Sequence, residues 1–258
     1  MNLIHRTIES AQVRLLSSQY AIGQSKYRRI YFFHVQKAGG SSIRRSFYNL
    51  AEPREKVPEV FHNPTIRRAV IGDKVYVSHH VGMINQGYYF FASSHLPQSA
   101  INLPENTFTF TCLRNPVKRF LSRYRELLRL NIEQPDNFHL KQAAGWFSTD
   151  FMNMLEKIPD EEILFQLRMF SENLDVNEAV ENVQRLSYFF LTNEMQQGIQ
   201  YLIQHLDLPL ELYHERKTNY DYELPDEQLS YLKQRLQPAI DMYQKLETIY
   251  YSRASASS

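Results

Sequence analysis

A lysine, two glycines and two serines directly follow an apolar segment, and together they could bind a phosphate or sulfate group. The segment 29–35 (RIYFFHV) has the aromatic and β-branched composition of a buried strand. Gly39 and Gly40 permit a tight turn and a close approach of the backbone to a ligand. Ser41 and Ser42 open a helix predicted over 41–50, whose first N–H groups favour an anion, and Lys37 adds a cation beside the turn.

The order of these residues excludes two common nucleotide-binding loops. Lys37 precedes the glycines, whereas the lysine of the triphosphatase loop G-x-x-x-x-G-K-[ST] follows them, and the spacing is not that of G-x-G-x-x-G either. On spacing alone, an ordinary strand–helix turn with an exposed lysine explains the segment equally well.

A second cationic group follows another predicted strand, 107–113 (TFTFTCL). Arg114 stands at its carboxyl end, the place where open parallel sheets bind ligands. A helix predicted from Pro116 carries Ser122 two turns from its start. Arg114 offers a planar fork for a phosphate and Ser122 a hydroxyl. We interpret the remaining arginines of this helix, Arg119, Arg123 and Arg125, as solvated or paired with carboxylates such as Glu126.

A pair of histidines could supply a general base. His79 and His80 come just after the predicted strand 74–78 (KVYVS), again at a carboxyl end. Histidine titrates near neutral pH, and a well-placed general base contributes roughly 10²–10⁴-fold to a rate. The alternative is that both rings only cap the strand or pair locally. His34 should point into the core, and no group of His, Cys, Asp and Glu has the spacing of metal ligands.

Two strings resemble one family of enzymes. The segment 32–43, FFHVQKAGGSSI, resembles the 5'-phosphosulfate motif F-H-V-P-K-[TA]-[GA]-[GS]-[TS]-S of the Golgi-type carbohydrate sulfotransferases, which include heparan sulfate 2-O-sulfotransferases; Gln36 replaces the usual proline. The segment 113–124, LRNPVKRFLSRY, resembles the 3'-phosphate motif L-R-[DN]-P-x-x-R-x-x-S-x-[YF] of the same family. The two occur in the family's order, and weaker similarity extends over about 28–250.

The resemblance implies a donor, a set of site residues and an activity of EC 2.8.2 type. The donor is 3'-phosphoadenosine 5'-phosphosulfate (PAPS), and the product is the desulfated nucleotide PAP, with no metal. Its phosphosulfate would contact Lys37 and the residues Ala38, Gly39, Gly40, Ser41 and Ser42, and its 3'-phosphate would contact Arg114 and Ser122. His80 matches the family's H-V element and is the first candidate for the base, with His79 second. The expected acceptor is a hydroxyl group of a carbohydrate, and the alternatives are a tyrosyl or a small-molecule hydroxyl.

The elements that position these residues predict an α/β fold. Four short apolar segments, 29–35, 74–78, 107–113 and 186–192, are separated by room for helices, which favours a mainly parallel sheet flanked by helices, with a helical C-terminal part. With the resemblance, this is a P-loop-like sulfotransferase fold. We expect one domain over 1–251, with a helical segment over 1–26, and a disordered tail over 252–258. Helices are predicted over 116–130, 177–185, 194–206 and 225–251. Acceptor loops are expected over 51–73, 83–104 and 131–175.

Composition limits the partners. The formal net charge is +1, so no global field attracts nucleic acid or an anionic membrane, and Cys112 is the single cysteine. No segment approaches the roughly 20 apolar residues of a membrane span. Relatives in animals carry a Golgi anchor, so we expect a soluble, cytoplasmic, bacterial relative. Two alternative functions are that of a nucleotide-dependent kinase and that of a non-catalytic protein that binds PAP or another nucleotide.

Overall fold

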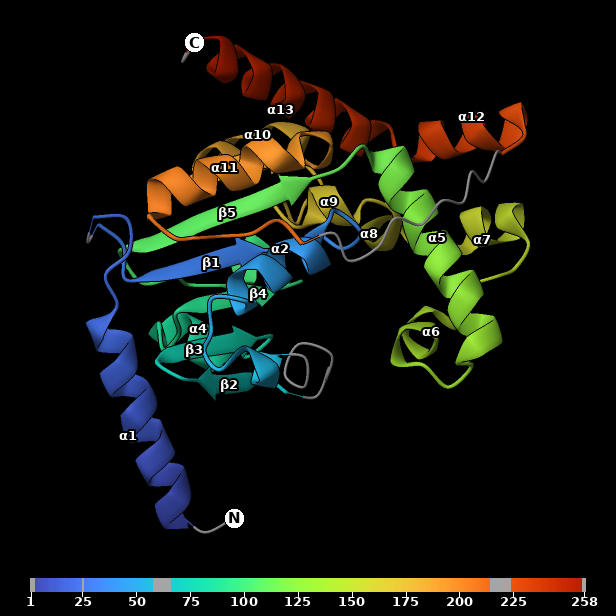
Figure 1. The fold of residues 1–258 in the computed structure, drawn as a ribbon. Helices are drawn as coiled ribbons and strands as arrows, with labels where there is room; N and C mark the ends of the chain where they lie inside the picture. Colours follow the sequence, from blue (N-terminus) through green and yellow to red (C-terminus); the bar gives the residue numbers. More distant parts are fainter. Residues whose placement is uncertain (1–2, 25, 58–65, 214–223, 257–258) are drawn as a thin grey trace.

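Six strands form one sheet in the order β2-β3-β4-β1-β5-β6 (Figure 1). The computed structural model describes residues 3–24, 26–57, 66–213 and 224–256, and the side chains from 11 to 253 within these ranges. The strands are β1 (Arg29–Phe33), β2 (Arg68–Ile71), β3 (Lys74–Ser78), β4 (Phe91–Ser94), β5 (Thr107–Leu113) and β6 (Tyr188–Leu191). Only β2 runs antiparallel to its neighbour, β3; the other pairs are parallel. The predicted α/β class with a mainly parallel sheet is confirmed.

Helices cover both faces of the sheet and follow the alternation of β1. Ile30 and Phe32 face one apolar cluster with α2 (Gly40–Tyr48) and α11 (Met195–Leu206). Tyr31 and Phe33 face the other cluster, with the remaining core helices. These are α4 (Val81–Gln86), α5 (Pro116–Glu133), α6 (Phe138–Ala143), α7 (Phe151–Lys157), α8 (Asp160–Ile163), α9 (Phe165–Arg168), α10 (Val176–Gln184), α12 (Asp226–Arg235) and α13 (Gln237–Ala256). Short 3₁₀ helices occupy Arg54–Lys56, Gln98–Ala100 and Thr192–Glu194.

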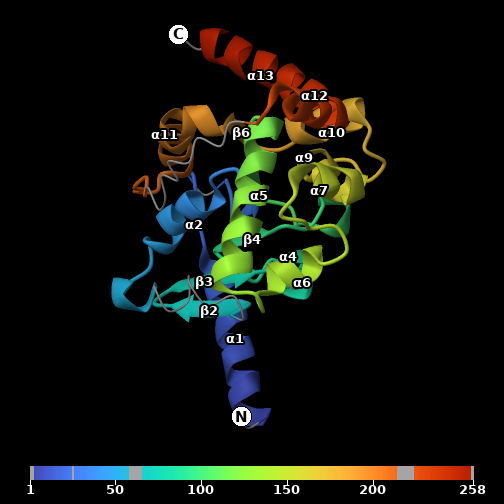
Figure 2. The same ribbon diagram turned by 90° about the vertical axis from the view of Figure 1, so that its right-hand side faces the viewer.

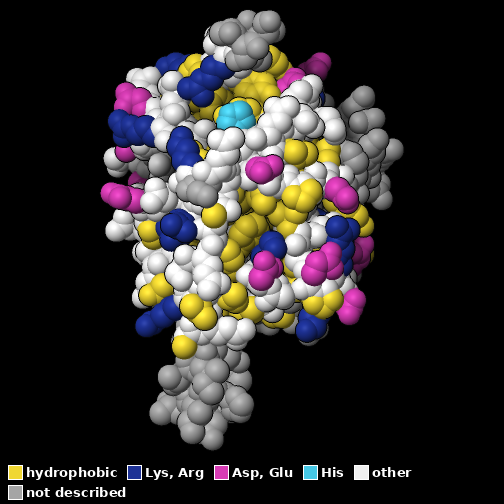
Figure 3. Space-filling view, turned by 60° about the vertical axis from the view of Figure 1, so that its left-hand side comes forward, with side chains coloured by type: hydrophobic (Ala, Val, Ile, Leu, Met, Phe, Trp, Pro, Cys, Tyr) yellow, Lys and Arg dark blue, Asp and Glu magenta, His cyan; other side chains and the backbone are white. Residues whose placement is uncertain are grey.

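Helix α1 (Leu3–Gln19) projects beyond these layers. It extends away from the body of the molecule beyond the β2 and β3 edge (Figure 1). Figure 2 views the sheet toward the carboxyl ends of the parallel strands, with α2 and α11 on one side, α4, α9 and α10 on the other, and α5 across the ends. Lys, Arg, Asp and Glu side chains are interspersed on the face shown in Figure 3, in keeping with the small net charge. No helix in the described part of the chain is long and apolar enough to span a bilayer.

The predicted strands are all present, but two others were missed. β3 and β5 have the predicted bounds, whereas β1 and β6 are shorter than predicted. β2 (RAVI) is only partly buried and begins with an arginine, and β4 (FASS) ends in two serines, so neither is the continuous apolar run that marks a buried strand. Both fall in segments that we expected to be acceptor loops, and part of the first of these, 58–65, lies outside the described residues.

The long C-terminal helix predicted over 225–251 is two helices. α12 ends at Arg235 and α13 starts at Gln237, with Pro238 as its second residue. Proline lacks the N–H that a continuous helix would need and tolerates only the first turn, so the break falls just before it. α13 also continues to Ala256, into the expected disordered tail, because alanine has the highest helix propensity of any residue.

The packing of α11 on β6 gives a first prediction. A Cβ atom added at Gly198 would lie 2.3 Å from Cδ2 of the buried Phe190 ring. Gly198→Ala gains roughly 1 kcal/mol of helix propensity, but overpacking costs about 1–3 kcal/mol. We therefore expect unchanged or lowered stability in urea unfolding, with a net loss of up to about 2 kcal/mol.

Gly145→Ala is the control, because a Cβ atom there meets nothing within 4 Å. It should equal or exceed the wild type in stability. If Gly198→Ala proved the more stabilising of the two variants, the Phe190 contact would not limit the packing of α11.

Candidate active site

The turn between β1 and α2 leaves the N-terminus of α2 without a side-chain cap. Gly39 is the N-cap of α2 and has φ 78°, a left-handed conformation that favours glycine. Because Gly39 has no side chain, it gives no capping hydrogen bond to the first N–H groups of α2. Lys37 also has a positive φ, of 66°. The predicted tight turn is confirmed, and the first N–H groups of a helix are the ones that favour an anion.

Gly40 allows the His34 ring to pack directly against the backbone of the turn. A Cβ atom at this position would lie 1.7 Å from Nε2 of His34, whose ring is buried and stacks on Phe32 with centroids 5.2 Å apart. His34 therefore points into the core, as predicted. Among the other residues of the turn, the Ala38 side chain is buried and its N–H donates to the Val35 carbonyl at 3.3 Å. Ser41 is exposed and Ser42 is half-buried.

Arg114 joins the second motif to the first. Its Nη1 donates to the Lys37 carbonyl oxygen over 2.9 Å. Its own backbone is clamped by the buried Gln166: the Arg114 N–H donates to Oε1 and the Gln166 Nε2 donates to the Arg114 carbonyl, both at 3.0 Å. Burial, followed by the neighbouring charge of Arg125, lowers the pKa of Arg114. Sequence reasoning missed Gln166, which lies in the aromatic and polar segment 131–175 where no pattern was apparent.

Lys37 reaches across to α5. Its Nζ lies 3.0 Å from Oε1 of Glu126, and Nη1 of Arg123 lies 2.8 Å from Oε2 of the same carboxylate. Ser122, half-buried, precedes Glu126 by one helical turn and so shares its face of α5. The structure thus brings Lys37 and Arg114 together, with Ser122 on the helix face that approaches them. Pairing of Arg123 with Glu126 is confirmed.

Arg119 is buried, in contrast to its interpretation as solvated or paired with a carboxylate. It is 3 % exposed, and its Nη2 donates to the Ile163 carbonyl at 2.8 Å. The arginine of the second motif at this position is therefore a structural link between α5 and α8.

The two candidate bases lie in different environments. His80 is exposed and is the N-cap of α4, where its Nδ1 accepts the Met83 N–H at 3.3 Å. His79 has φ 54° and a half-buried ring whose centroid is 5.0 Å from that of His95. His95 lies in turn 4.3 Å from the His34 ring, so three imidazoles connect the end of β3 to the end of β1. Burial, with Arg67 and Arg44, lowers the pKa of His79 to about 4.

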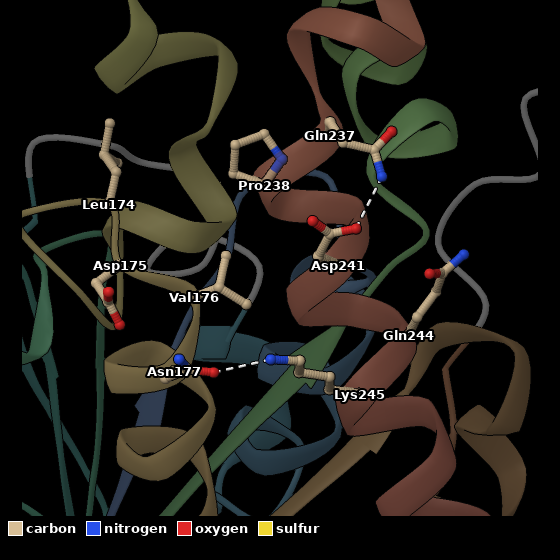
Figure 4. A pocket seen from close by; sticks show the side chains of 9 residues that line it. All are labelled: Leu174, Asp175, Val176, Asn177, Gln237, Pro238, Asp241, Gln244 and Lys245. Atoms are coloured by element: carbon tan, nitrogen blue, oxygen red, sulfur yellow. Dashed lines mark hydrogen bonds between the residues drawn. The ribbon is translucent and has the colours of Figure 1, made fainter.

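A separate cavity of about 550 Å³ lies between α10 and α13. Figure 4 shows two hydrogen bonds among its lining residues, Gln237 to Asp241 at 2.7 Å and Lys245 to Asn177 at 2.8 Å. None of the predicted site residues lines it. No cluster of three His, Cys, Asp or Glu side chains suited to a metal ion occurs within the ranges that the structure describes.

Comparison with known proteins assigns a family. No curated protein sequence matches the chain. The model of the sulfotransferase family matches residues 21–252, a span that includes both motifs and the whole sheet. The match confirms the sulfotransferase resemblance at the level of family, and sulfuryl transfer in general with it. Because it covers nearly the whole chain, the protein belongs to the sulfotransferase family.

Proposed function

We propose that this protein transfers the sulfuryl group of PAPS to a hydroxyl group of a carbohydrate acceptor. The observation that supports the proposal is the hydrogen bond from Arg114 to the Lys37 carbonyl, which joins the segments that carry the two sequence motifs. A donor with a phosphate at each end of its nucleoside needs two such groups within one molecule's reach.

The residues present fit an anionic donor. The helix start at Gly39–Gly40 and the ammonium of Lys37 suit the phosphosulfate, and the guanidinium of Arg114 with the Ser122 hydroxyl suits the 3'-phosphate. PAPS supplies the activated sulfuryl group. The chain supplies position and charge, which dominate the closely related transfer of phosphoryl groups.

We assign the base to His80, with His79 as the second candidate. A general base works best with a pKa near the operating pH, and a pKa of about 4 makes the His79 ring a weak proton acceptor. His80 is exposed, and its Nδ1 accepts one long hydrogen bond, from Met83 N–H at 3.3 Å. Breaking that bond would free Nδ1 to take the proton of the acceptor hydroxyl.

The donor assignment predicts how nucleotides stabilise the protein. PAP should raise the melting temperature more than AMP does, because only PAP carries the 3'-phosphate that Arg114 would hold. A ligand present at 100 times its Kd stabilises by about 2.7 kcal/mol. Lys37→Ala and Arg114→Ala should each remove most of the shift.

Lys141→Ala provides the control, since this lysine is exposed and pairs only loosely with Asp136 at 3.3 Å. Its shift with PAP should equal that of the wild type. Equal shifts from PAP and AMP in the wild type would contradict the proposed 3'-phosphate grip.

The base assignment predicts a loss of turnover without a loss of binding. His80→Asn should lower kcat about 10²–10⁴-fold and leave the Kd for PAP unchanged. Asparagine is a strong N-cap residue, so this variant keeps the cap of α4. The measurement is transfer of ³⁵S from labelled PAPS to a panel of glycans. His79→Asn is the paired variant, and if it alone abolished transfer, the base would be His79.

A further inference from the structure

Glu126 shares its two carboxylate oxygens between two cations. Oε1 lies 3.0 Å from Lys37 Nζ and Oε2 lies 2.8 Å from Arg123 Nη1. Arg123 is on the same helix, one turn earlier, whereas Lys37 comes from the turn after β1. The contact with Arg123 is therefore local to α5, and the contact with Lys37 joins α5 to the first motif.

The carboxylate is charged at neutral pH. Burial alone would raise the pKa of Glu126, but the charges of Lys37 and Arg123 and their hydrogen bonds outweigh burial and lower it. A negative charge therefore lies against the ammonium proposed to contact the donor. Its presence opposes the binding of an anion there, because like charges repel most strongly where water is partly excluded.

The geometry allows Lys37 to exchange partners. Its side chain is 26 % exposed and that of Glu126 is 23 % exposed, so an incoming anion can reach the pair from solvent. When Lys37 leaves, Glu126 keeps Arg123, so no carboxylate is left buried without a cation. The exchange replaces one anionic partner of the ammonium by another, so the ion pair is replaced rather than lost.

We propose that Glu126 is a positioning residue that holds Lys37 in the donor-free enzyme and competes with the donor for it. This inference rests on the proposed function and adds a determinant of donor affinity to it. In the free protein, Glu126 keeps the ammonium at the turn. On binding, the donor takes over the ammonium, while Arg123 retains the carboxylate.

The test is the Kd for PAP by isothermal titration calorimetry, which needs no acceptor. Glu126→Gln keeps the shape of the side chain and removes its charge, so PAP should bind about two- to five-fold tighter than to the wild type. Damage to the fold would weaken binding, so a gain in affinity separates competition for Lys37 from a merely structural role. Glu133→Gln is the matched control on the same helix, where Glu133 pairs with Arg129 and both are about half exposed; it should leave the Kd unchanged.

Glu126→Asp separates position from charge. It keeps the negative charge but withdraws the carboxylate by one methylene, so its Kd should fall between those of the wild type and Glu126→Gln. A Kd for Glu126→Gln equal to or weaker than that of the wild type overturns the inference, as does a Glu126→Asp value equal to the wild type. If the wild type binds PAP but the variants give either of these results, only the inference about Glu126 is wrong. If neither the wild type nor any variant binds PAP, the proposed function is wrong as well.

Discussion

The parallel pairing of β1 with β5 is the constraint on which the site depends. Phe33, the last residue of β1, lies opposite Thr111, and the Thr111 hydroxyl donates to the Phe33 carbonyl at 2.8 Å. In a parallel pair both carboxyl ends emerge at the same edge, so the segments that follow must begin side by side. The turn with Lys37 and the segment with Arg114 are far apart in sequence and adjacent in space for this reason. The hydrogen bond of Arg114 to the Lys37 carbonyl fixes their relative position.

Much of this fold could be predicted because the central strands β1 and β5 are rich in aromatic and β-branched residues. β1 and β5 are covered by helices on both faces, which demands the aromatic and β-branched composition that made them visible. β4 is equally central but ends in Ser93 and Ser94, both buried. Ser94 is tolerated there because its hydroxyl pairs with the Tyr31 hydroxyl at 2.6 Å. When the buried polar residues of a strand are hydrogen-bonded to residues distant in sequence, the local sequence does not indicate that the strand is buried.

The same distinction holds for the site. Lys37, the glycines and Arg114 lie within contiguous motifs, so their types and spacing could be recognised. Gln166 and His95 act through partners that are distant in sequence: Gln166 clamps the Arg114 backbone, and the Nδ1 of His95 lies 2.6 Å from the His34 carbonyl. Glu126 was visible only as a helix partner of the arginines. Its second contact, to Lys37, depends on how α5 crosses the strand ends.

The two principal cations of the site are held in different ways, and this difference matches the chemistry proposed for them. Arg114 donates to a backbone carbonyl and is itself clamped through its backbone, so its guanidinium is supported by neutral partners that need not be displaced. Such a group suits a phosphate that is present in both the donor and the product. Lys37 is held by a carboxylate that can exchange it for another anion. A cation with an exchangeable partner suits the 5' end of the donor, where negative charge develops on the leaving oxygen as the sulfuryl group is transferred. Neutral support for Arg114 and a replaceable counter-ion for Lys37 follow from the same crossing of α5 over the ends of β1 and β5.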